Sequence, residues 1–236
     1  LQFGSATPPE ALVRRLSRPR AASMLATMPG LQLGVVTSIE DPEGEYRVRI
    51  RLPMVDAGDD GVWARVATLD AGAKRGFVFR PEPGDEVVVG FFDDDPRQPV
   101  LLGMLHSSAK AAPLAGDRHN PDRGLATRGG LKWLFHDDKK ALTLATPGGR
   151  QLQFSDNDEA MTLSDASGNK VVLDKDGITL ETQGSINLKA GNGVSIQSGA
   201  ALQLKAGTEL SAEGAATAEV KSAGVAKLTG SLVQIN

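Results

Sequence analysis

The chain of 236 residues contains no cysteine, and only 4% of its residues are aromatic. The lack of cysteine excludes a disulfide scaffold, a thiolate metal site and a cysteine nucleophile. A formal net charge of −3 argues against a broadly basic nucleic-acid-binding surface. No apolar run approaches the roughly 18 residues that a membrane-spanning helix needs. Leu1 is not followed by a basic and then an apolar region, so we expect no signal peptide.

The C-terminal third of the chain lacks whole residue classes. The last proline is Pro147 and the last aromatic residue is Phe154, yet residues 155–236 contain ten glycines. A globular core normally uses aromatic side chains for bulk. This part of the chain must therefore build its core in another way, and an internal repeat is the first possibility to test.

A repeat with a period of eight residues is present from residue 178 onward. Two apolar positions, separated by one mostly polar residue, recur seven times in phase, which argues against a disordered low-complexity tail. Alternation with a period of two is typical of a strand. The apolar positions are Ile178, Leu180, Ile186, Leu188, Val194, Ile196, Leu202, Leu204, Leu210, Ala212, Ala218, Val220, Ala226 and Leu228.

Each repeat provides one short strand and one corner, which cannot enclose a core alone. A single chain coiling three times per turn would give too few turns for a stable solenoid. Three chains, each giving one strand per layer, would close a triangle at every layer. We therefore predict an intertwined homotrimer whose core consists of the larger residues of the repeat, all of those above except Ala212, Ala218 and Ala226, where the axis narrows.

Residues 31–108 have a different pattern, with five short strand candidates and no clear helix. The clearest is 46–52, in which Tyr46, Val48, Ile50 and Leu52 alternate with three arginines. Five strands in so short a segment predict a small OB-fold barrel. The other four candidates are residues 34–39, 62–69, 86–92 and 99–105.

These patterns predict an all-β chain: an OB-fold barrel followed by a C-terminal intertwined trimeric β-helix, a β-prism needle. We assign residues 31–108 to the barrel, 109–130 to a linker and 131–236 to the spike, in which apolar pairs from Trp133/Phe135 to Val171/Leu173 predict prism strands with longer turns. Residues 8–17 are predicted to form a short helix.

No residue pattern indicates catalysis, a metal or a cofactor. His106, His119 and His136 show no metal-ligand spacing, and Asp174–Gly177 lacks the glutamate that completes a calcium loop. Asp93–Asp95 is explained by a surface turn. No nucleophile-elbow, phosphate-loop or dinucleotide motif is present. The arginines of 46–52 lack the interleaved aromatic residues of a single-strand-binding surface, so we predict no nucleic-acid partner.

Several segments resemble the VgrG-type central spike proteins of extracellular contractile injection systems, which are phage-tail-like particles with a baseplate V-like spike. The segments are 31–36 (LQLGVV), 42–48 (PEGEYRV), 62–65 (VWAR), 81–91 (PEPGDEVVVGF), 95–103 (DPRQPVLLG) and the C-terminal 218–236. Residues 1–4 (LQFG) resemble the end of the preceding hub domain, so 1–30 would be the end of that domain plus a linker.

The resemblance implies a structural, non-enzymatic role as a membrane-piercing spike. The family forms a homotrimer at the centre of the baseplate, contacts the hub and inner tube proteins, carries a PAAR-repeat tip protein and meets the target envelope transiently. The particle is assembled in the bacterial cytoplasm and released, or acts as part of a virion. The lysozyme insertion and the apical HxH iron site of some relatives are absent from this sequence.

Two surfaces are predicted for partners. At the C-terminus the phase of the repeat shifts, and Leu232, Val233, Ile235 and Asn236 would form a threefold platform for the tip protein. In the N-terminal segment, Arg14, Arg15, Arg18 and Arg20 are expected to contact the hub or baseplate. The alternatives are a spike-borne glycan hydrolase and a receptor-binding adhesin.

Overall fold

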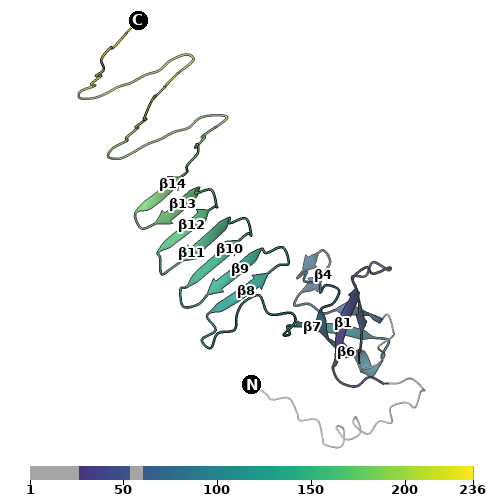
Figure 1. Ribbon diagram of the computed structural model, residues 1–236. Coiled ribbons are helices and arrows are strands. Elements are labelled where there is room, and N and C mark those ends of the chain that lie inside the picture. Colours follow the sequence, from purple (N-terminus) through teal and green to yellow (C-terminus); the bar gives the residue numbers. More distant parts are fainter. Residues whose placement is uncertain (1–26, 54–60, 236) are drawn as a thin grey trace, which may run out of the picture. The chain divides into compact units, whose positions relative to one another are not determined.

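The computed structural model describes residues 27–53 and 61–235. The chain divides into two units, residues 1–181 and 182–236, which are described separately below. Regular structure in the described residues consists of strands and one short 3-10 turn, η1 (Phe92–Asp94), so the expected all-β class is confirmed (Figure 1). In the described parts of the chain, no helix is long and apolar enough to cross a membrane.

Five strands close into a barrel in the order β1-β2-β3-β7-β6, with β6 pairing back onto β1. β3 and β7 run parallel, whereas the other neighbouring pairs are antiparallel. This arrangement is that of the expected OB-fold barrel. The strands are β1 (Gln32–Ser38), β2 (Val48–Arg51), β3 (Val62–Val66), β6 (Glu86–Phe91) and β7 (Pro99–Leu105), with a small hairpin of β4 (Ala71–Gly72) and β5 (Arg75–Gly76) between β3 and β6.

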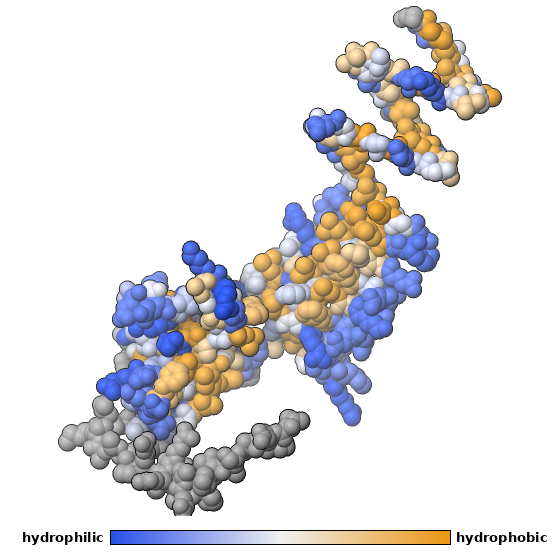
Figure 2. All heavy atoms as spheres, turned by 180° about the vertical axis from the view of Figure 1, so that it is seen from behind, coloured by the Kyte–Doolittle hydropathy of each residue, from blue (hydrophilic) through white to orange (hydrophobic). Residues whose placement is uncertain are grey.

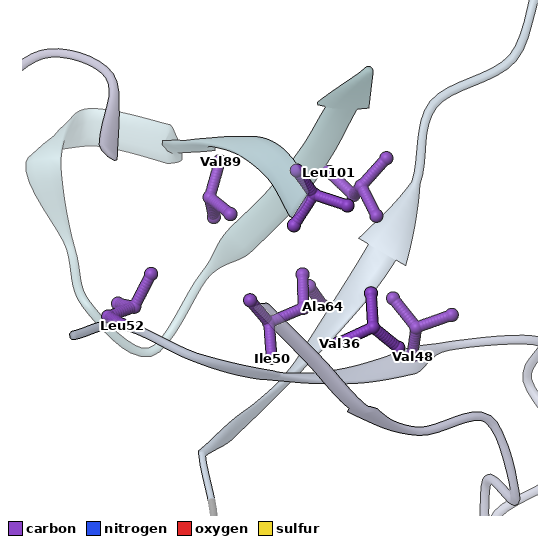
Figure 3. Packing of buried hydrophobic residues seen from close by; sticks show 8 residues of the cluster. Val36, Val48, Ile50, Leu52, Ala64, Val89 and Leu101 are labelled. Carbon is purple, nitrogen blue, oxygen red and sulfur yellow. The ribbon is translucent and has the colours of Figure 1, made fainter. Parts of the chain in front are cut away.

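The barrel contains the buried core of the described chain. Its side chains come from alternate positions of all five strands and point toward one another (Figure 3). Full burial of each aliphatic side chain contributes roughly 1.5–3 kcal/mol, so this set stabilises the barrel without help from other chains. The buried residues are Val36, Val48, Ile50, Leu52, Ala64, Val87, Val89 and Leu101.

The prediction that Tyr46 belongs to the second strand is wrong. β2 begins at Val48, and Tyr46 has a φ of 64° in the left-handed region with its ring exposed. The loop before it is held by Asp41, whose carboxylate accepts the backbone N–H groups of Glu43, Glu45 and Arg47. This loop bends the chain before the strand can start, a local effect that alternation does not reveal.

Seven strands form a second sheet in which every strand pairs antiparallel with its sequence neighbour (Figure 1). The pattern follows from short polar turns between pairs of apolar residues, and confirms the expected hairpins. The strands are β8 (Asp122–Ala126), β9 (Lys132–His136), β10 (Ala141–Ala145), β11 (Gln151–Ser155), β12 (Ala160–Ser164), β13 (Lys170–Asp174) and β14 (Gly177–Glu181).

The expectation that residues 109–130 are all linker is wrong at its C-terminal end. β8 lies inside this range and pairs with β9, placing Leu125 opposite Trp133. The polar and glycine-rich composition of the segment hides the strand, because β8 is stabilised by pairing along β9 and contributes few apolar side chains of its own.

Residues 182–235 contain no strand within the single chain, but they follow the eight-residue period. The chain bends at residues 183–184, 191–192, 199–200, 207–208, 215–216, 223–224 and 231. Between the bends run straight segments, which give this unit its zigzag path (Figure 1). The corners therefore recur at the spacing that the sequence repeat predicts.

Candidate functional site

Two rows of apolar side chains cross one face of the seven-stranded sheet. The strand registers place residues of successive strands directly opposite one another, which is the closest cross-strand arrangement. The first row consists of Phe135, Leu142, Phe154, Met161, Leu173 and Ile178. The second row consists of Leu125, Trp133, Leu144, Leu152, Leu163, Val171 and Leu180.

This apolar face, defined by the two rows, is open in the single chain. Trp133 is 44% exposed, Leu163 53% and Ile178 72%. Figure 2 shows the apolar residues running across the strands with hydrophilic residues on either side. The opposite face is mostly polar, with Thr143, Gln153 and Thr162 at the centres of their strands. A sheet with one apolar and one polar face requires a cover for the apolar one.

The two rows lead directly into the eight-residue repeat. Each row ends on β14, at Ile178 and Leu180, and these two residues also occupy the first pair of apolar positions of the repeat. The remaining predicted core residues from Ile186 to Leu228 are likewise exposed, for example Ile196 at 61%. The structure thus places the predicted core residues on a surface that one chain alone does not bury.

The apolar pairs of the sheet were expected from sequence, but the predicted trimer core included only Ile178 and later residues. In the sheet, the row of apolar residues that ends at Leu180 begins on β8, at Leu125, and includes Trp133 on β9. The missing information was the register, because uneven turn lengths hide the alignment of the pairs until the strands are paired. Trp133 and Phe135 lie side by side on β9, with ring centroids 5.5 Å apart.

Carboxylates hold the turns of the sheet rather than forming a reactive centre. Asp165 accepts hydrogen bonds from the Asn169 side chain at 2.8 Å and from the backbone N–H groups of Ser167 and Asn169. These bonds, that of the Asn169 side chain foremost, lower the pKa of Asp165. Asp174 similarly accepts the backbone N–H groups of Asp176 and Gly177, which assigns this acidic segment to a tight turn.

The barrel loops use carboxylates in the same way. The side chain of Asp41 is only 4% exposed and lies 2.8 Å from Nη2 of Arg47, whose hydrogen bond keeps the pKa of Asp41 well below its usual range. Arg97 bonds to Asp95 at 2.8 Å and lowers the pKa of Asp95 to about 2. Both aspartates therefore stay ionised near neutral pH and fasten loops.

No metal centre is formed by the part of the chain that the structure describes. Within it, no three histidine or carboxylate side chains are grouped to hold an ion. Nε2 of His136 lies 3.9 Å from an Asp122 oxygen at the edge of the sheet. In the Asp93–Asp95 segment, Asp95 is occupied by Arg97. This segment lies in and directly after η1, which is the turn expected from sequence.

The predicted partner surfaces are only partly described. Leu232, Val233 and Ile235 are exposed at 82%, 51% and 85%. Asn236 lies outside the described residues, as do Arg14, Arg15, Arg18 and Arg20 and the predicted helix at 8–17. The roles of both surfaces remain predictions.

Comparison with known families gives two matches that follow this architecture. Residues 32–106 match the injector OB domain of type VI secretion systems and phage baseplates. Residues 141–236 match the C-terminal trimerisation domain of phage baseplate V proteins. The first match covers the barrel, and the second covers the sheet from β10 onward together with the eight-residue repeat.

Curated relatives are of the same kind. The chain is 30% identical over 105 residues to the actin cross-linking toxin VgrG1 of Vibrio cholerae, covering 39% of this chain and 10% of the relative. It is 35% identical over 92 residues to the type VI secretion system spike protein VgrG5 of Pseudomonas aeruginosa, covering 36% and 12%. It is 25% identical over 138 residues to VgrG1c of the same species, covering 52% and 19%.

The matched segment is thus a small part of each relative's length. The barrel, the one-sided sheet and the repeat all fall within the two matched family domains. The chain belongs to the VgrG-type spike proteins of type VI secretion systems and phage baseplates, and its C-terminal part is their trimerisation domain.

Proposed function

We propose that this chain is the structural, membrane-piercing spike at the centre of the baseplate of a contractile, phage-tail-like injection particle. Three copies form the spike, and sheath contraction drives it through the target envelope. The single observation that carries the proposal is the exposed apolar face of the sheet, whose two rows end at Ile178 and Leu180, the first apolar pair of the repeat. Residues 141–236, which include most of these rows and the whole repeat, match a trimerisation domain.

Three copies supply the cover that the apolar face requires. If three one-sided sheets turn their apolar faces inward, they enclose a prism with polar faces outside, and the repeat continues this prism as an intertwined β-helix. Backbone groups of residues 182–235, which belong to no strand in one chain, then pair with those of the other chains. Absence of proline after Pro147 keeps every N–H group available for that pairing.

The proposed arrangement suits a part that is loaded mechanically. The hydrogen-bond ladders run along the axis, and the chains cannot separate without unwinding from one another. Unfolding then has a high kinetic barrier, which is the relevant measure of stability for a spike used once under force.

The two ends of the chain are proposed to carry its partners. Three copies of Leu232, Val233, Ile235 and Asn236 would form an apolar threefold platform for a PAAR-repeat tip protein. Three equal contacts on one partner raise the affinity of a small interface through avidity. The arginines Arg14, Arg15, Arg18 and Arg20 would contact the hub or another baseplate component, with the inner tube beyond it.

A catalytic role is not supported by the described residues. Among the described residues, the carboxylates with a lowered pKa are Asp41, Asp85, Asp95 and Asp165, and all four fasten loops or turns through hydrogen bonds. A general acid for glycan hydrolysis would instead need a raised pKa. The proposed localisation follows from the structural role: assembly into the particle in the bacterial cytoplasm, and action after release or contraction.

The proposal is tested first by the native mass of the purified chain, which we expect to be that of a trimer. The second test places Ile196→Asp in the spike gene of a particle-producing bacterium and compares it with Ile196→Val. We expect the aspartate variant to give no contractile particles that permeabilise target cells, whereas the valine variant gives normal ones. A monomeric wild-type chain, or permeabilising particles from the aspartate variant, would contradict the proposal.

A further inference from the structure

The outer surface of the barrel has two sides of opposite character. On β1, β6 and β7, which are neighbours in the barrel, residues that point away from the core are mainly aliphatic. Leu33 pairs with Val88, which pairs in turn with Gly103. We call this side the apolar barrel face, and it consists of Leu31, Leu33, Val88, Leu102 and Leu105.

The apolar barrel face is contiguous. Gly90 lies between two of its leucines: a methyl group added at Gly90 would lie 3.2 Å from Leu102 Cδ1 and 3.6 Å from Leu31 Cδ2. In the next row, Val35 pairs with Glu86 and Glu86 with Leu105, so one carboxylate borders the leucines. The side chains of Leu31, just before β1, and of Leu102 on β7 therefore both lie next to Gly90 on β6.

The face is exposed although the barrel core is complete without it. Leu31 is 65% exposed, Leu33 60% and Leu102 49%, whereas Val87 and Val89, which alternate with Val88 on the same strand, are fully buried. Single exposed leucines are normal on a protein surface, but a contiguous group across three strands marks an interaction site.

The other side of the barrel has the opposite chemistry. β2 and β3 turn Arg49, Arg51 and Arg65 outward around Trp63, and the guanidinium of Arg49 lies 5.9 Å from the Trp63 ring centroid. The inward neighbours of these residues, Ile50 among them, belong to the core. The barrel thus has one charged side that suits exposure to solvent and one apolar side that suits burial against a partner.

The connection to the trimerisation domain indicates which partner the apolar barrel face contacts. Leu102 and Leu105 lie on β7, and the chain passes from the end of β7 through residues 106–121 to β8, where Leu125 begins the rows of the apolar sheet face. Three barrels tied by so short a connection to one trimer have a high effective concentration toward one another. Three identical apolar faces are then available within the same assembly.

We propose that the apolar barrel face packs against the barrel of a second copy of this chain, with the arginine side facing outward. This inference rests on the proposed trimeric spike and extends the contact between chains from the trimerisation domain to the barrel. It assigns to the barrels a share in holding the three chains together at the base of the spike.

The chain contains no cysteine, so single cysteines can report the contact directly. Leu33→Cys lies on the apolar barrel face, and Arg65→Cys on β3 is its matched control on the arginine side. Each full-length variant is treated with a short bismaleimide, and its native mass is measured in parallel. At equal trimer content we expect cross-linked chains from Leu33→Cys in about tenfold higher yield than from Arg65→Cys.

The outcomes separate this inference from the proposed function. A trimeric mass with no cross-link from Leu33→Cys, or with equal yields from both variants, overturns the barrel contact and leaves the trimeric spike standing. A contact with a separate hub protein would give that result. A monomeric mass overturns both. Adding Ile196→Asp to Leu33→Cys should abolish the cross-link, because the barrels are then no longer tied together.

Discussion

Replacing Ile196 by aspartate is the sharpest test of the trimer core. Ile196 lies in the middle of the repeat, at an apolar position where the single chain leaves it 61% exposed. Because this side chain makes few contacts within its own chain, the substitution should not disturb the fold of one chain. Any large effect must then come from contacts between chains.

The expected magnitude follows from that exposed fraction. Full burial of an isoleucine is worth roughly 1.5–3 kcal/mol, so the area left exposed is worth about 1–2 kcal/mol per chain and roughly 3–6 kcal/mol per trimer. The variant loses this gain and also buries three carboxylates around one axis. Each unpaired buried charge costs several kcal/mol more. This total free-energy cost exceeds the stabilisation that one layer of the repeat contributes to the proposed trimer, so we expect a monomer at neutral pH.

Native mass spectrometry and sedimentation measure the outcome. Ile186→Asp should behave in the same way, whereas Lys205→Ala and Glu213→Ala, on the polar positions of the repeat, should leave the trimer intact. The barrel should remain folded in all four variants, because its buried core comes from residues of the barrel alone. A full trimer from Ile196→Asp would show that this position does not face the axis.

Further predictions concern other parts of the chain. The wild-type trimer should migrate as a trimer in SDS gels without heating, since dissociation requires unwinding; a monomer band alone would refute interlocking. Deleting residues 1–30 should leave the 31–236 trimer intact but abolish its incorporation into particles, as measured by immunoblotting of purified particles. Deleting residues Ser231–Asn236 should leave a folded trimer that no longer retains a PAAR protein in a pull-down. Asp41→Asn should lower the barrel melting temperature above about pH 5, because hydrogen bonds from Arg47 and nearby backbone groups lower the pKa of Asp41 in the folded state and so stabilise the barrel while Asp41 is ionised. This stabilisation is lost on acidification, so thermal melting followed by circular dichroism should show a smaller difference from the wild type below about pH 4.

The barrel and the repeat could be predicted from sequence because each has a strict period. Alternation over 46–52 predicted that Val48 and Ile50 lie on one face of a strand, and both are fully buried in the core. The eight-residue spacing of the apolar pairs predicted the bends, which recur at the same interval. In both cases the side-chain pattern repeats because the backbone conformation repeats, so the pattern alone predicts that conformation.

Sequence reasoning failed where a contact depends on a partner distant in sequence or on a local bend. β8 was missed because its stability comes from pairing with β9, and its glycine and charged residues carry no apolar pattern. Tyr46 was misplaced because the carboxylate of Asp41 turns the chain before β2. The apolar barrel face was missed because its leucines alternate with core residues, and the two sides of a barrel strand look alike until the strands are closed.

The distribution of buried side chains implies an order of assembly. The barrel buries Val36, Val48, Ile50 and their neighbours within one chain, so it can fold alone. The apolar sheet face and the repeat are exposed in one chain, and residues 182–235 form no strand there. Folding of the barrel therefore does not depend on concentration, whereas completion of the spike does. In the proposed trimer, each chain enters assembly with a finished barrel and an open apolar sheet face, and the other two chains then cover that face.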